Sequence, residues 1–227
     1  MTFQLKTDDL TVAMITMNEE KAVAKVILDI QKVVPSAEIL IVDSSKDQTA
    51  EIAQSLGARV IKQFPPQGYG LAMDRAIRSA SGKVVITLDC DDTYPTDQIT
   101  ELARLVLEEG YDVVDASRLK KKPEAMPILN YVANAAFALM ASAFFFTRLK
   151  DLHSGMRAYR KAVIIKWQYG PKPGDAFPVE LLLRPLKEGC KIKVVYIDYK
   201  ERIGQSTMRP LRSAWWTFRR ILRVRFS

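Results

Sequence analysis

The chain has 227 residues, of which 48% are hydrophobic and 26% charged, with only 10 Gly and 11 Pro. This composition predicts one large globular domain, or one domain with an appendage, and excludes a disordered, collagen-like or repeat protein. Two cysteines, Cys90 and Cys190, without metal-type spacing indicate reduced thiols and no structural zinc. Charged residues precede the first long apolar stretch, so we expect no secretory signal and a site that faces the cytoplasm.

The net charge of +8 is concentrated at one end of the chain. Residues 200–227 contain eight Lys or Arg and one Glu, so the rest of the chain is nearly neutral. A basic segment of this kind suits an anionic membrane surface, phosphorylated ligands or nucleic acid. No nucleic-acid recognition motif accompanies the charge, so no nucleic-acid partner is predicted.

Short apolar runs alternate with helical periodicity through the first half of the chain. Strands are expected at residues 10–17, 38–42, 58–61, 84–88 and 112–116, and helices at 19–34, 49–56, 70–79 and 97–109. This alternation predicts an α/β fold, with a mainly parallel sheet covered by helices on both faces. In such sheets ligands bind beyond the carboxyl ends of the strands, where polar residues follow several of these runs.

Residues 126–146 form a stretch of 21 residues without a charge, long enough for a helix that spans a bilayer. Proline, asparagine and serine interrupt the stretch, and its many alanines add little transfer free energy. A single crossing would also place the acidic residues near Asp89 and the cluster at 151–157 on opposite sides of the membrane. A core helix or a helical pair lying in the membrane interface are the remaining alternatives.

The chain ends with a predicted strand at residues 191–199 and a basic amphipathic helix at 209–227. On this helix an apolar stripe is formed by Leu211, Trp215, Phe218 and Leu222, with arginines beside and opposite it. Such a helix suits an anionic lipid surface, with tryptophan at headgroup depth. The alternative is a helix that packs its stripe on the protein and leaves its arginines in solvent.

The strongest signal for chemistry is acidic. Asp89, Asp91 and Asp92 follow the buried strand at 84–88, and three carboxylates within four positions repel one another unless a cation lies among them. Oxygen ligands of this kind suit Mg²⁺ or Mn²⁺. We therefore predict that Asp89 and Asp91 hold a divalent ion, which neutralises the charge of a diphosphate leaving group. The alternative is an acidic turn in which Asp92 caps a helix.

Weaker signals surround this one. Asp43 ends the second strand and can accept hydrogen bonds from a base or ribose, and Gly70 lies at a helix start that a ligand can approach closely. A P-loop is excluded because its Lys-Ser/Thr ending is missing. His153, the single histidine, precedes Ser154, but adjacent residues rarely point together, which argues against a serine hydrolase.

Seven motifs follow one another in a fixed order. They are Asn18-Glu19-Glu20, the run 43–49 from Asp43 to Thr49, Gly68-Tyr-Gly-Leu-Ala72, Asp89-Cys-Asp91, Ser117-Arg118, the run 151–157 from Asp151 to Arg157, and Arg202-Ile-Gly-Gln-Ser206. In this order the chain resembles the family-2 glycosyltransferases, and within them the dolichyl-phosphate or polyprenyl-phosphate hexosyltransferases of the mannose-synthase type. The resemblance implies a GT-A fold over about residues 1–208, a nucleotide-sugar donor, Mg²⁺ or Mn²⁺, and inversion at the anomeric carbon.

The resemblance also implies roles for single residues. Donor-binding roles fall to Asn18, Glu19, Asp43, Gly70, Asp89 and Ser206, with Glu19 and Asp43 near the base. Asp91, Arg118 and Arg202 are implied in catalysis, Asp91 as a metal ligand and the arginines near the phosphates. Ser154, Gly155 and Arg157 are implied to shape the acceptor side, and residues 126–146 match a pair of amphipathic helices on the membrane.

Several positions depart from the family pattern. Ile15 and Met17 stand where proline and tyrosine commonly flank the base, and Thr93 stands where mannose synthases often have glutamine. The base and the sugar therefore stay open between the GDP-mannose and UDP-glucose types. An arginine of the helical pair is absent, and Lys120, Lys121 or Lys122 is the substitute we expect.

The predicted activity is transfer of a hexose from a nucleotide sugar to a polyprenyl or dolichyl phosphate, by a protein peripherally bound to an anionic, cytoplasmic membrane face. One alternative is a family-2 transferase with a soluble acceptor. Another is a non-catalytic, membrane-associated nucleotide-binding subunit. Glu180, in the apolar stretch 177–183, is expected either to contact the acceptor or to pair within a helix.

Overall fold

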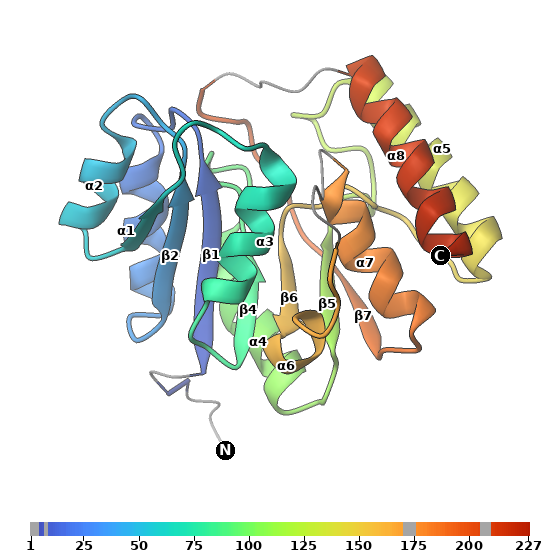
Figure 1. Cartoon of the computed structure of the whole chain (residues 1–227), viewed down its shortest axis with the longest axis horizontal. Helices are drawn as coiled ribbons and strands as arrows, with labels where there is room; N and C mark the ends of the chain where they lie inside the picture. The colour runs from blue at the N-terminus through green and yellow to red at the C-terminus, as the bar shows by residue number, and fades with distance from the viewer. Residues whose placement is uncertain (1–4, 7–8, 170–175, 205–209) are drawn as a thin grey trace.

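The computed structural model describes residues 5–6, 9–169, 176–204 and 210–227 (Figure 1). Within these residues the strands form one seven-stranded sheet in the order β3-β2-β1-β4-β6-β5-β7. The strands are β1 (Leu10–Thr16), β2 (Glu38–Asp43), β3 (Arg59–Lys62), β4 (Val84–Thr87), β5 (Val113–Ser117), β6 (Arg157–Arg160) and β7 (Ile192–Tyr196). All neighbours are parallel except β6, which is antiparallel to both β4 and β5.

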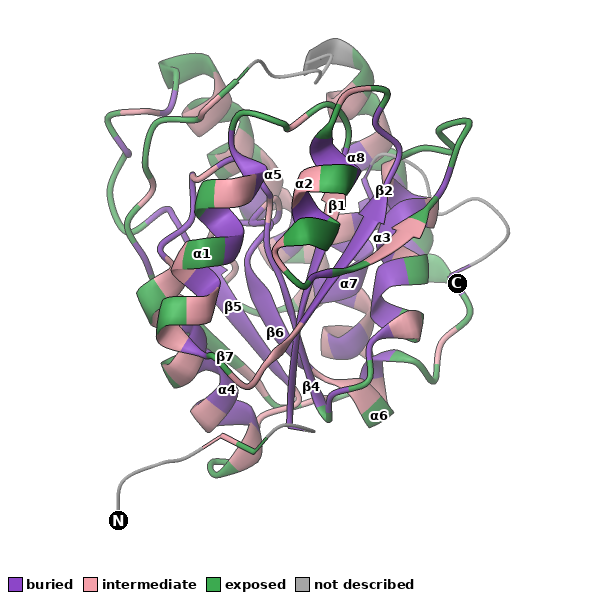
Figure 2. Ribbon diagram, turned by 90° about the vertical axis from the view of Figure 1, so that its left-hand side faces the viewer, coloured by how far each residue is buried: buried purple, intermediate pink, exposed green. Residues whose placement is uncertain are grey.

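Helices cover both faces of the sheet (Figure 2). They are α1 (Val23–Val33), α2 (Thr49–Ser55), α3 (Tyr69–Ser79), α4 (Ile99–Leu107), α5 (Ile128–Phe145), α6 (Lys161–Ile164), α7 (Phe177–Lys187) and α8 (Pro210–Phe226), with a short 3-10 helix at Thr96–Gln98. α1, α2 and α4 pack on one face, and α3, α6 and α7 pack on the other. The predicted α/β architecture is confirmed, and each strand expected in the first half lies within two residues of its predicted bounds.

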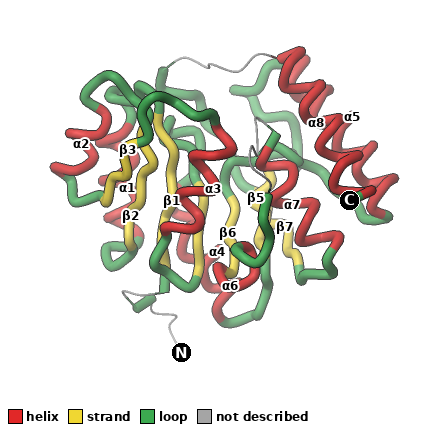
Figure 3. Tube along the Cα trace, in the orientation of Figure 1, coloured by secondary structure: helices red, strands yellow, loops and turns green. Residues whose placement is uncertain are grey.

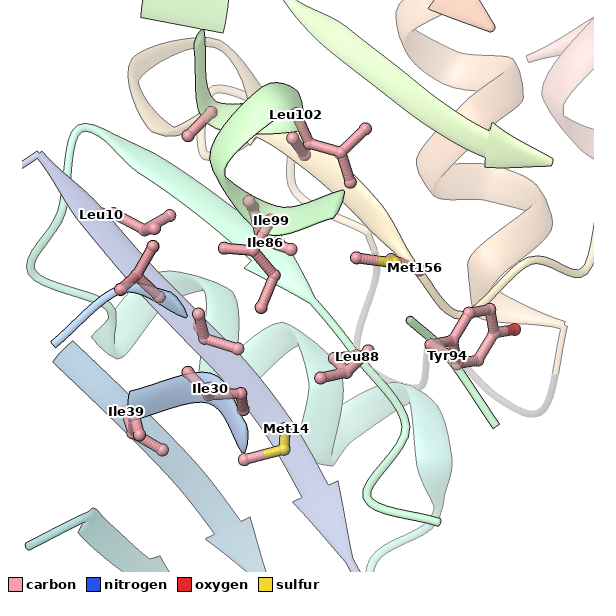
Figure 4. Close-up of a cluster of buried hydrophobic side chains, with 14 of the residues drawn as sticks. Leu10, Met14, Ile30, Ile39, Ile86, Leu88, Tyr94, Ile99, Leu102 and Met156 are labelled. Atoms are coloured by element: carbon pink, nitrogen blue, oxygen red, sulfur yellow. The ribbon is translucent and has the colours of Figure 1, made fainter. Parts of the chain in front are cut away.

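The two-sided core explains why the strands are nearly uniform in hydrophobicity. Every residue of β4 is buried, because helices cover both of its faces. On the α1 and α4 side, Ile30, Ile86 and Leu102 belong to one continuous cluster (Figure 4). A fully buried side chain of this size contributes roughly 1.5–3 kcal/mol relative to an exposed one, so alternation of apolar runs is enough to specify this half of the fold.

The antiparallel strand β6 was not predicted, and it places the loop before it beside the parallel strand ends. Arg157, the first residue of β6, is in register with both Thr87 of β4 and Asp115 of β5. Residues 151–156 therefore enter the sheet at the edge where β4 and β5 end. Figure 3 shows the loops gathered along this edge, which is opposite the N-terminus.

The uncharged stretch forms one helix, α5, so the expectation of a helical pair within residues 126–146 is wrong. A core helix is wrong as well, because only Ala138 and Ala141 of α5 are buried. By length and composition alone, α5 is long and apolar enough to cross a membrane. Only 11% of its 18 residues are buried in the protein. α5 packs against α8, on the side of the molecule that holds β5 and β7 (Figure 1).

The C-terminal helix is present as α8, and two residues of its predicted apolar stripe face away from the protein. Trp215 and Phe218 of the predicted stripe point outward, with 56% and 38% of their surface exposed. The inner face carries four buried residues, which are Thr217, Arg220, Ile221 and Val224. The alternative of a stripe packed on the protein is therefore wrong, and the side chain of Leu211 lies outside the described residues.

Candidate active site

Asp89, at the end of β4, lies directly against Gly155. A Cβ atom added to Gly155 would lie 2.7 Å from Cγ of Asp89, closer than such atoms approach, so a side chain there would displace the carboxylate. Burial, and then the charge of Asp91, raise the pKa of Asp89 to about 6. The sequence prediction that these aspartates crowd together at a strand end therefore agrees with the geometry.

Asp91 is buried and held in one orientation. Its Oδ1 accepts hydrogen bonds from the backbone N of Thr93 at 3.2 Å and from Oγ1 of Thr93 at 2.6 Å. Its Oδ2 lies 3.3 Å from Nη1 of Arg202. Thr93, which departs from the family pattern, thus fixes the carboxylate by donating to it.

Arg202 is the cation between two acidic side chains. Its Nη2 donates to Oε1 of Glu19 at 2.7 Å, while Nη1 faces Asp91. The backbone of the same loop is attached to the acidic turn, because Ile203 N donates to the carbonyl of Asp91 at 3.0 Å. Burial raises the pKa of Glu19 against the opposing effect of Arg202. The structure thus brings the ends of β1 and β4 and the late loop together, as predicted.

Asp43 is fully buried at the end of β2. Its Oδ1 accepts from Oγ1 of Thr16 at 2.7 Å and from Oγ of Ser45 at 2.6 Å. Its Oδ2 forms an ion pair with Nζ of Lys62 at 3.2 Å and accepts no hydrogen bond among the described residues. Within the protein the carboxylate thus has two hydroxyl donors and one cation, and one of its oxygens accepts no hydrogen bond.

Arg118 follows β5 and is clamped by Asp151. Its Nε donates to Oδ2 of Asp151 at 2.8 Å and its Nη2 donates to Oδ1 at 3.0 Å. The guanidinium also lies 5.1 Å from the centroid of the Tyr199 ring. Burial opposes the charge of Asp151, but Arg118 and Arg157 outweigh it and lower the pKa of Asp151 to about 2. The pair is thus ionised. Arg118 is a fixed positive charge that partly opposes the rise in the pKa of Asp89.

Ser154 and Arg157 attach the 151–157 loop to strand β5. Oγ of Ser154 donates to the carbonyl of Ala116 at 2.6 Å. Arg157 is 1% exposed, and its guanidinium binds Asp115 together with the carbonyls of Leu152 and Pro178. Both side chains hold the 151–157 loop on the sheet.

Two more predicted donor residues, Asn18 and Gly70, lie near the carboxyl ends of the parallel strands. Asn18 ties the loop after β1 to the loop after β2, because its Oδ1 accepts from Lys46 N at 3.0 Å. Gly70 is buried in the first turn of α3 next to Tyr69, whose pKa is raised first by burial and then by the charge of Asp89. Ser206 lies outside the described residues.

The protein offers two carboxylates, Asp89 and Asp91, to a divalent ion. Within the described part of the chain there is no group of three His, Cys, Asp or Glu side chains that could hold a metal ion. Mg²⁺ and Mn²⁺ accept one or two protein carboxylates when substrate phosphates and water complete the coordination. Two neighbouring carboxylates, one with a raised pKa, fit such an ion.

A groove of about 600 Å³ runs between α5, the loop after β5 and the loop after α5. Its lining combines apolar side chains such as Leu119 and Leu139 with the cations of Lys120, Arg148 and Lys150. Leu119, the residue after Arg118, is among the residues that line it. Lys120 is the one of the three predicted lysines that lines it.

Sequence reasoning missed Asp151 as the partner of Arg118, and it dismissed His153. Asp151 was visible as the first residue of its motif, but nothing in the spacing pairs it with a residue 33 positions earlier. Glu180, whose role was open, pairs with Arg184 at 3.1 Å and with Arg220 on α8. It therefore serves to hold helices together and does not reach the groove.

Comparisons with known proteins identify the family of the chain. Residues 11–167 match the family model described as Glycosyl transferase family 2. A dolichyl-phosphate hexose transferase of Haloferax volcanii is 43% identical over 204 residues, which is 89% of this chain and 88% of that protein. The glycosyltransferase AglJ of the same organism is 31% identical over 92% of this chain and 69% of its own length. The resemblance inferred from the motifs is confirmed.

Solved structures show the same fold. Glucosyl-3-phosphoglycerate synthase from Mycobacterium tuberculosis, crystallised with uridine diphosphate, superposes with a TM-score of 0.75 at 20% identity, covering 96% of this chain and 80% of that one. Mannosyl-3-phosphoglycerate synthase from Rubrobacter xylanophilus has a TM-score of 0.71 at 19% identity, covering 95% and 73%. The predicted GT-A fold is thereby confirmed.

Proposed function

Because the chain belongs to glycosyl transferase family 2, we propose that it is an inverting hexosyltransferase that moves a hexose from a nucleotide sugar to a polyprenyl phosphate at a membrane surface. One observation carries the proposal. The acidic pair, Arg202 and Arg118 lie at the carboxyl ends of the parallel strands, and a partly apolar, basic groove lies along the exposed apolar helix α5.

The donor half of the site binds the nucleotide and its diphosphate. Asp43 Oδ2 accepts a hydrogen bond from the base or ribose, and Asp89 with Asp91 hold Mg²⁺ or Mn²⁺. When bound, this ion neutralises negative charge that develops on the diphosphate leaving group. Arg202 is already at the acidic pair and turns its guanidinium to the phosphates.

The transfer step needs no strong general base. An oxygen of the acceptor phosphate, anionic near neutral pH, forms the new bond to the anomeric carbon as the bond to the diphosphate oxygen breaks. The electron pair of that bond leaves with the nucleoside diphosphate, and the configuration inverts. Arg118, held by Asp151, orients the acceptor phosphate, so the rate enhancement comes from alignment and charge stabilisation.

The acceptor half follows from the surface of α5 and α8. Large apolar side chains are exposed along the pair, with Leu139 73% and Trp215 56% exposed, and Arg219 and Arg223 lie on the outer side of α8. Apolar residues at headgroup depth beside arginines suit an anionic membrane interface. We propose that α5 lies in this interface and does not cross the bilayer, because Ala138 and Ala141 pack it onto the protein.

A donor and acceptor panel tests the activity. The protein is incubated with Mg²⁺ or Mn²⁺, a set of GDP- and UDP-hexoses, and either a short polyprenyl phosphate or 3-phosphoglycerate. We expect a lipid-linked hexose from one donor and no product with the soluble phosphate. Product with the soluble phosphate alone would establish a soluble acceptor, and no turnover of any donor would favour the non-catalytic subunit.

Vesicle flotation tests the membrane surface separately. Removing α8 would uncover the apolar residues of α5 and α7 that pack against Ile221 and Val224, so point substitutions are the better probe. Leu139→Gln with Trp215→Gln removes exposed apolar area and should abolish flotation with vesicles that contain anionic lipid. Leu28→Gln, an exposed leucine on α1, is the control and should float like the parent. Equal flotation of all three proteins would rule out this surface.

A further inference from the structure

His153 joins two helices that are far apart in the sequence. Its Nδ1 lies 2.6 Å from Oδ1 of Asn134 on α5, and its Nε2 lies 2.8 Å from Oγ1 of Thr217 on α8. The ring also meets Phe137 of α5 edge to face, with centroids 6.1 Å apart. Both ring nitrogens therefore have a partner, one on each helix of the exposed pair.

The chemistry of these partners fixes the direction of the hydrogen bonds. An amide oxygen can only accept, so Nδ1 carries the proton and donates it to Asn134. Nε2 then accepts from the hydroxyl of Thr217. Burial lowers the pKa of His153 to about 4, which keeps the ring neutral near pH 7. A continuous chain of donors and acceptors thus runs from α8 through His153 to α5.

The backbone of His153 extends this chain to the active site. Its N–H donates to Oδ1 of Asp151 at 3.0 Å. The same carboxylate accepts Nη2 of Arg118 at 3.0 Å and Nε at 2.8 Å, and the Arg118 backbone N–H at 3.3 Å. A displacement of His153 therefore moves the group that orients the Arg118 guanidinium.

A second polar attachment joins α8 to α7, because Arg220 pairs with Glu180. Thr217, one turn earlier on the same face and 1% exposed, contacts His153. The imidazole is thus a polar connection between the helix pair and the carboxylate that holds Arg118.

We propose that His153 is a positioning residue that sets the orientation of Arg118 according to how the α5–α8 pair is seated. The inference rests on the proposed function, because the pair is the surface proposed to meet the membrane and its lipid acceptor. When the pair docks, Asn134 and Thr217 hold the imidazole, and its backbone N–H holds Asp151 in the position that presents Arg118 to the acceptor phosphate. Donor binding, at the ends of β1, β2 and β4, does not depend on this contact.

Steady-state kinetics with vesicle-embedded polyprenyl phosphate test the proposal. Thr217→Val keeps the shape of the side chain and removes its hydroxyl, and Asn134→Leu removes the amide. We expect each to lower kcat/KM for the lipid acceptor by about tenfold, the effect of one lost hydrogen bond of about 1.4 kcal/mol. The KM for the nucleotide sugar should change by less than about twofold on the same scale.

Two control variants separate positioning from general destabilisation. Thr217→Ser keeps the hydroxyl and should retain parental acceptor kinetics, and Asn130→Leu changes an amide one turn earlier on α5. Loss of activity in Thr217→Ser or Asn130→Leu equal to that in Thr217→Val overturns the proposal. The proposal is also overturned if Thr217→Val raises the KM for the nucleotide sugar by the same factor by which it lowers kcat/KM for the lipid acceptor.

Amide hydrogen exchange gives a readout that needs no catalysis. The backbone N–H groups of Arg118 and His153 both donate to Asp151. Thr217→Val should speed their exchange, and Asn130→Leu should leave it at the parental rate. If the parent proved inactive on polyprenyl phosphate, faster exchange in Thr217→Val would still support the coupling while the proposed function failed. Unchanged exchange at both amides would overturn the coupling itself.

Discussion

Asp89 and Asp91 follow the same strand, β4, but have different surroundings. Asp91 is fixed by two hydrogen bonds from Thr93 and faces Arg202. Asp89 lies against Gly155, and burial followed by the charge of Asp91 raises its pKa. One carboxylate is thus preorganised and the other gains most from an added cation, which is the asymmetry that a shared divalent ion would exploit.

Replacing Asp91 by asparagine should nearly abolish transfer. The change keeps the shape but removes the charge, and losing the ion's stabilisation of the leaving group is expected to lower kcat by about a thousandfold, several kcal/mol of barrier. Asp92→Asn is the matched control, because Asp92 pairs with the exposed Lys25 and has a left-handed backbone that asparagine tolerates. Transfer rates at saturating Mg²⁺ decide the matter, and undiminished turnover by Asp91→Asn would contradict the metal assignment.

Gly155→Ala should weaken metal binding although it substitutes no proposed ligand. The added Cβ overlaps the carboxylate of Asp89, so that carboxylate must leave its present position. We expect at least a tenfold loss of Mn²⁺ affinity in the presence of a nucleoside diphosphate, about 1.4 kcal/mol, measured by calorimetry. Mn²⁺ affinity equal to that of the parent would show that Asp89 does not contribute.

At the scale of elements, α8 buries a face that its amphipathic pattern did not identify. Its apolar stripe was expected to meet an anionic lipid surface or, alternatively, to pack on the protein. Trp215 and Phe218 of the stripe are exposed, and the face toward the protein carries Thr217 and Arg220. Arg220 is accommodated because Glu180, equally buried, supplies the opposite charge. A helix whose buried face is partly polar needs a specific partner, so the docking of α8 depends on this pair.

Arg220→Met should destabilise the protein far more than Arg219→Met. Removing Arg220 leaves Glu180 with Arg184 as a cationic partner on its own helix. The cost should therefore approach, without exceeding, the value of about 3–5 kcal/mol for a buried charge that loses its partner. Arg219 is exposed and lies over Trp215 and Trp216, so its loss should cost less than about 1 kcal/mol. Chemical denaturation of the two variants measures the difference. Equal midpoints would mean that the Glu180 pair contributes nothing to α8 docking.

For the whole molecule, the exposed charges and the buried charges lie in different places. Arg212, Arg219 and Arg223 lie on the exposed side of α8, whereas four buried charges form two pairs, Arg118 with Asp151 and Arg157 with Asp115. His153, between these regions, is held neutral by burial. Its titration therefore links the pH of the solution to the free energy of unfolding.

Stability should fall as the pH drops through this window. The folded pKa of His153, about 4, lies below the ordinary value of 6.5, so between these values the unfolded chain binds the extra proton. The contribution of His153 is complete above pH 6.5 and is lost toward pH 4. His153→Asn should flatten the slope of unfolding free energy against pH in this range, as measured by denaturation at several pH values. Parallel slopes for parent and variant would contradict the buried, neutral ring.

The sequence by itself determined the alternating half of the fold and the acidic corner of the site. Buried parallel strands must be apolar on both faces, and this requirement leaves a pattern that can be read without a structure. Polar residues at the ends of such strands must meet at one edge, so Glu19, Asp43, Asp89 and Asp91 could be grouped from their positions alone. Their order along the chain also carried the family resemblance.

Only the tertiary structure decided the contacts that join distant segments. β6 is short and antiparallel, and no local pattern announces that its preceding loop brings Gly155 onto Asp89 and Asp151 onto Arg118. The orientation of α8 depended on a buried charge finding its partner 40 residues away. Periodicity records which side chains are apolar, but pairings between polar groups depend on distances in space, which the one-dimensional pattern does not contain.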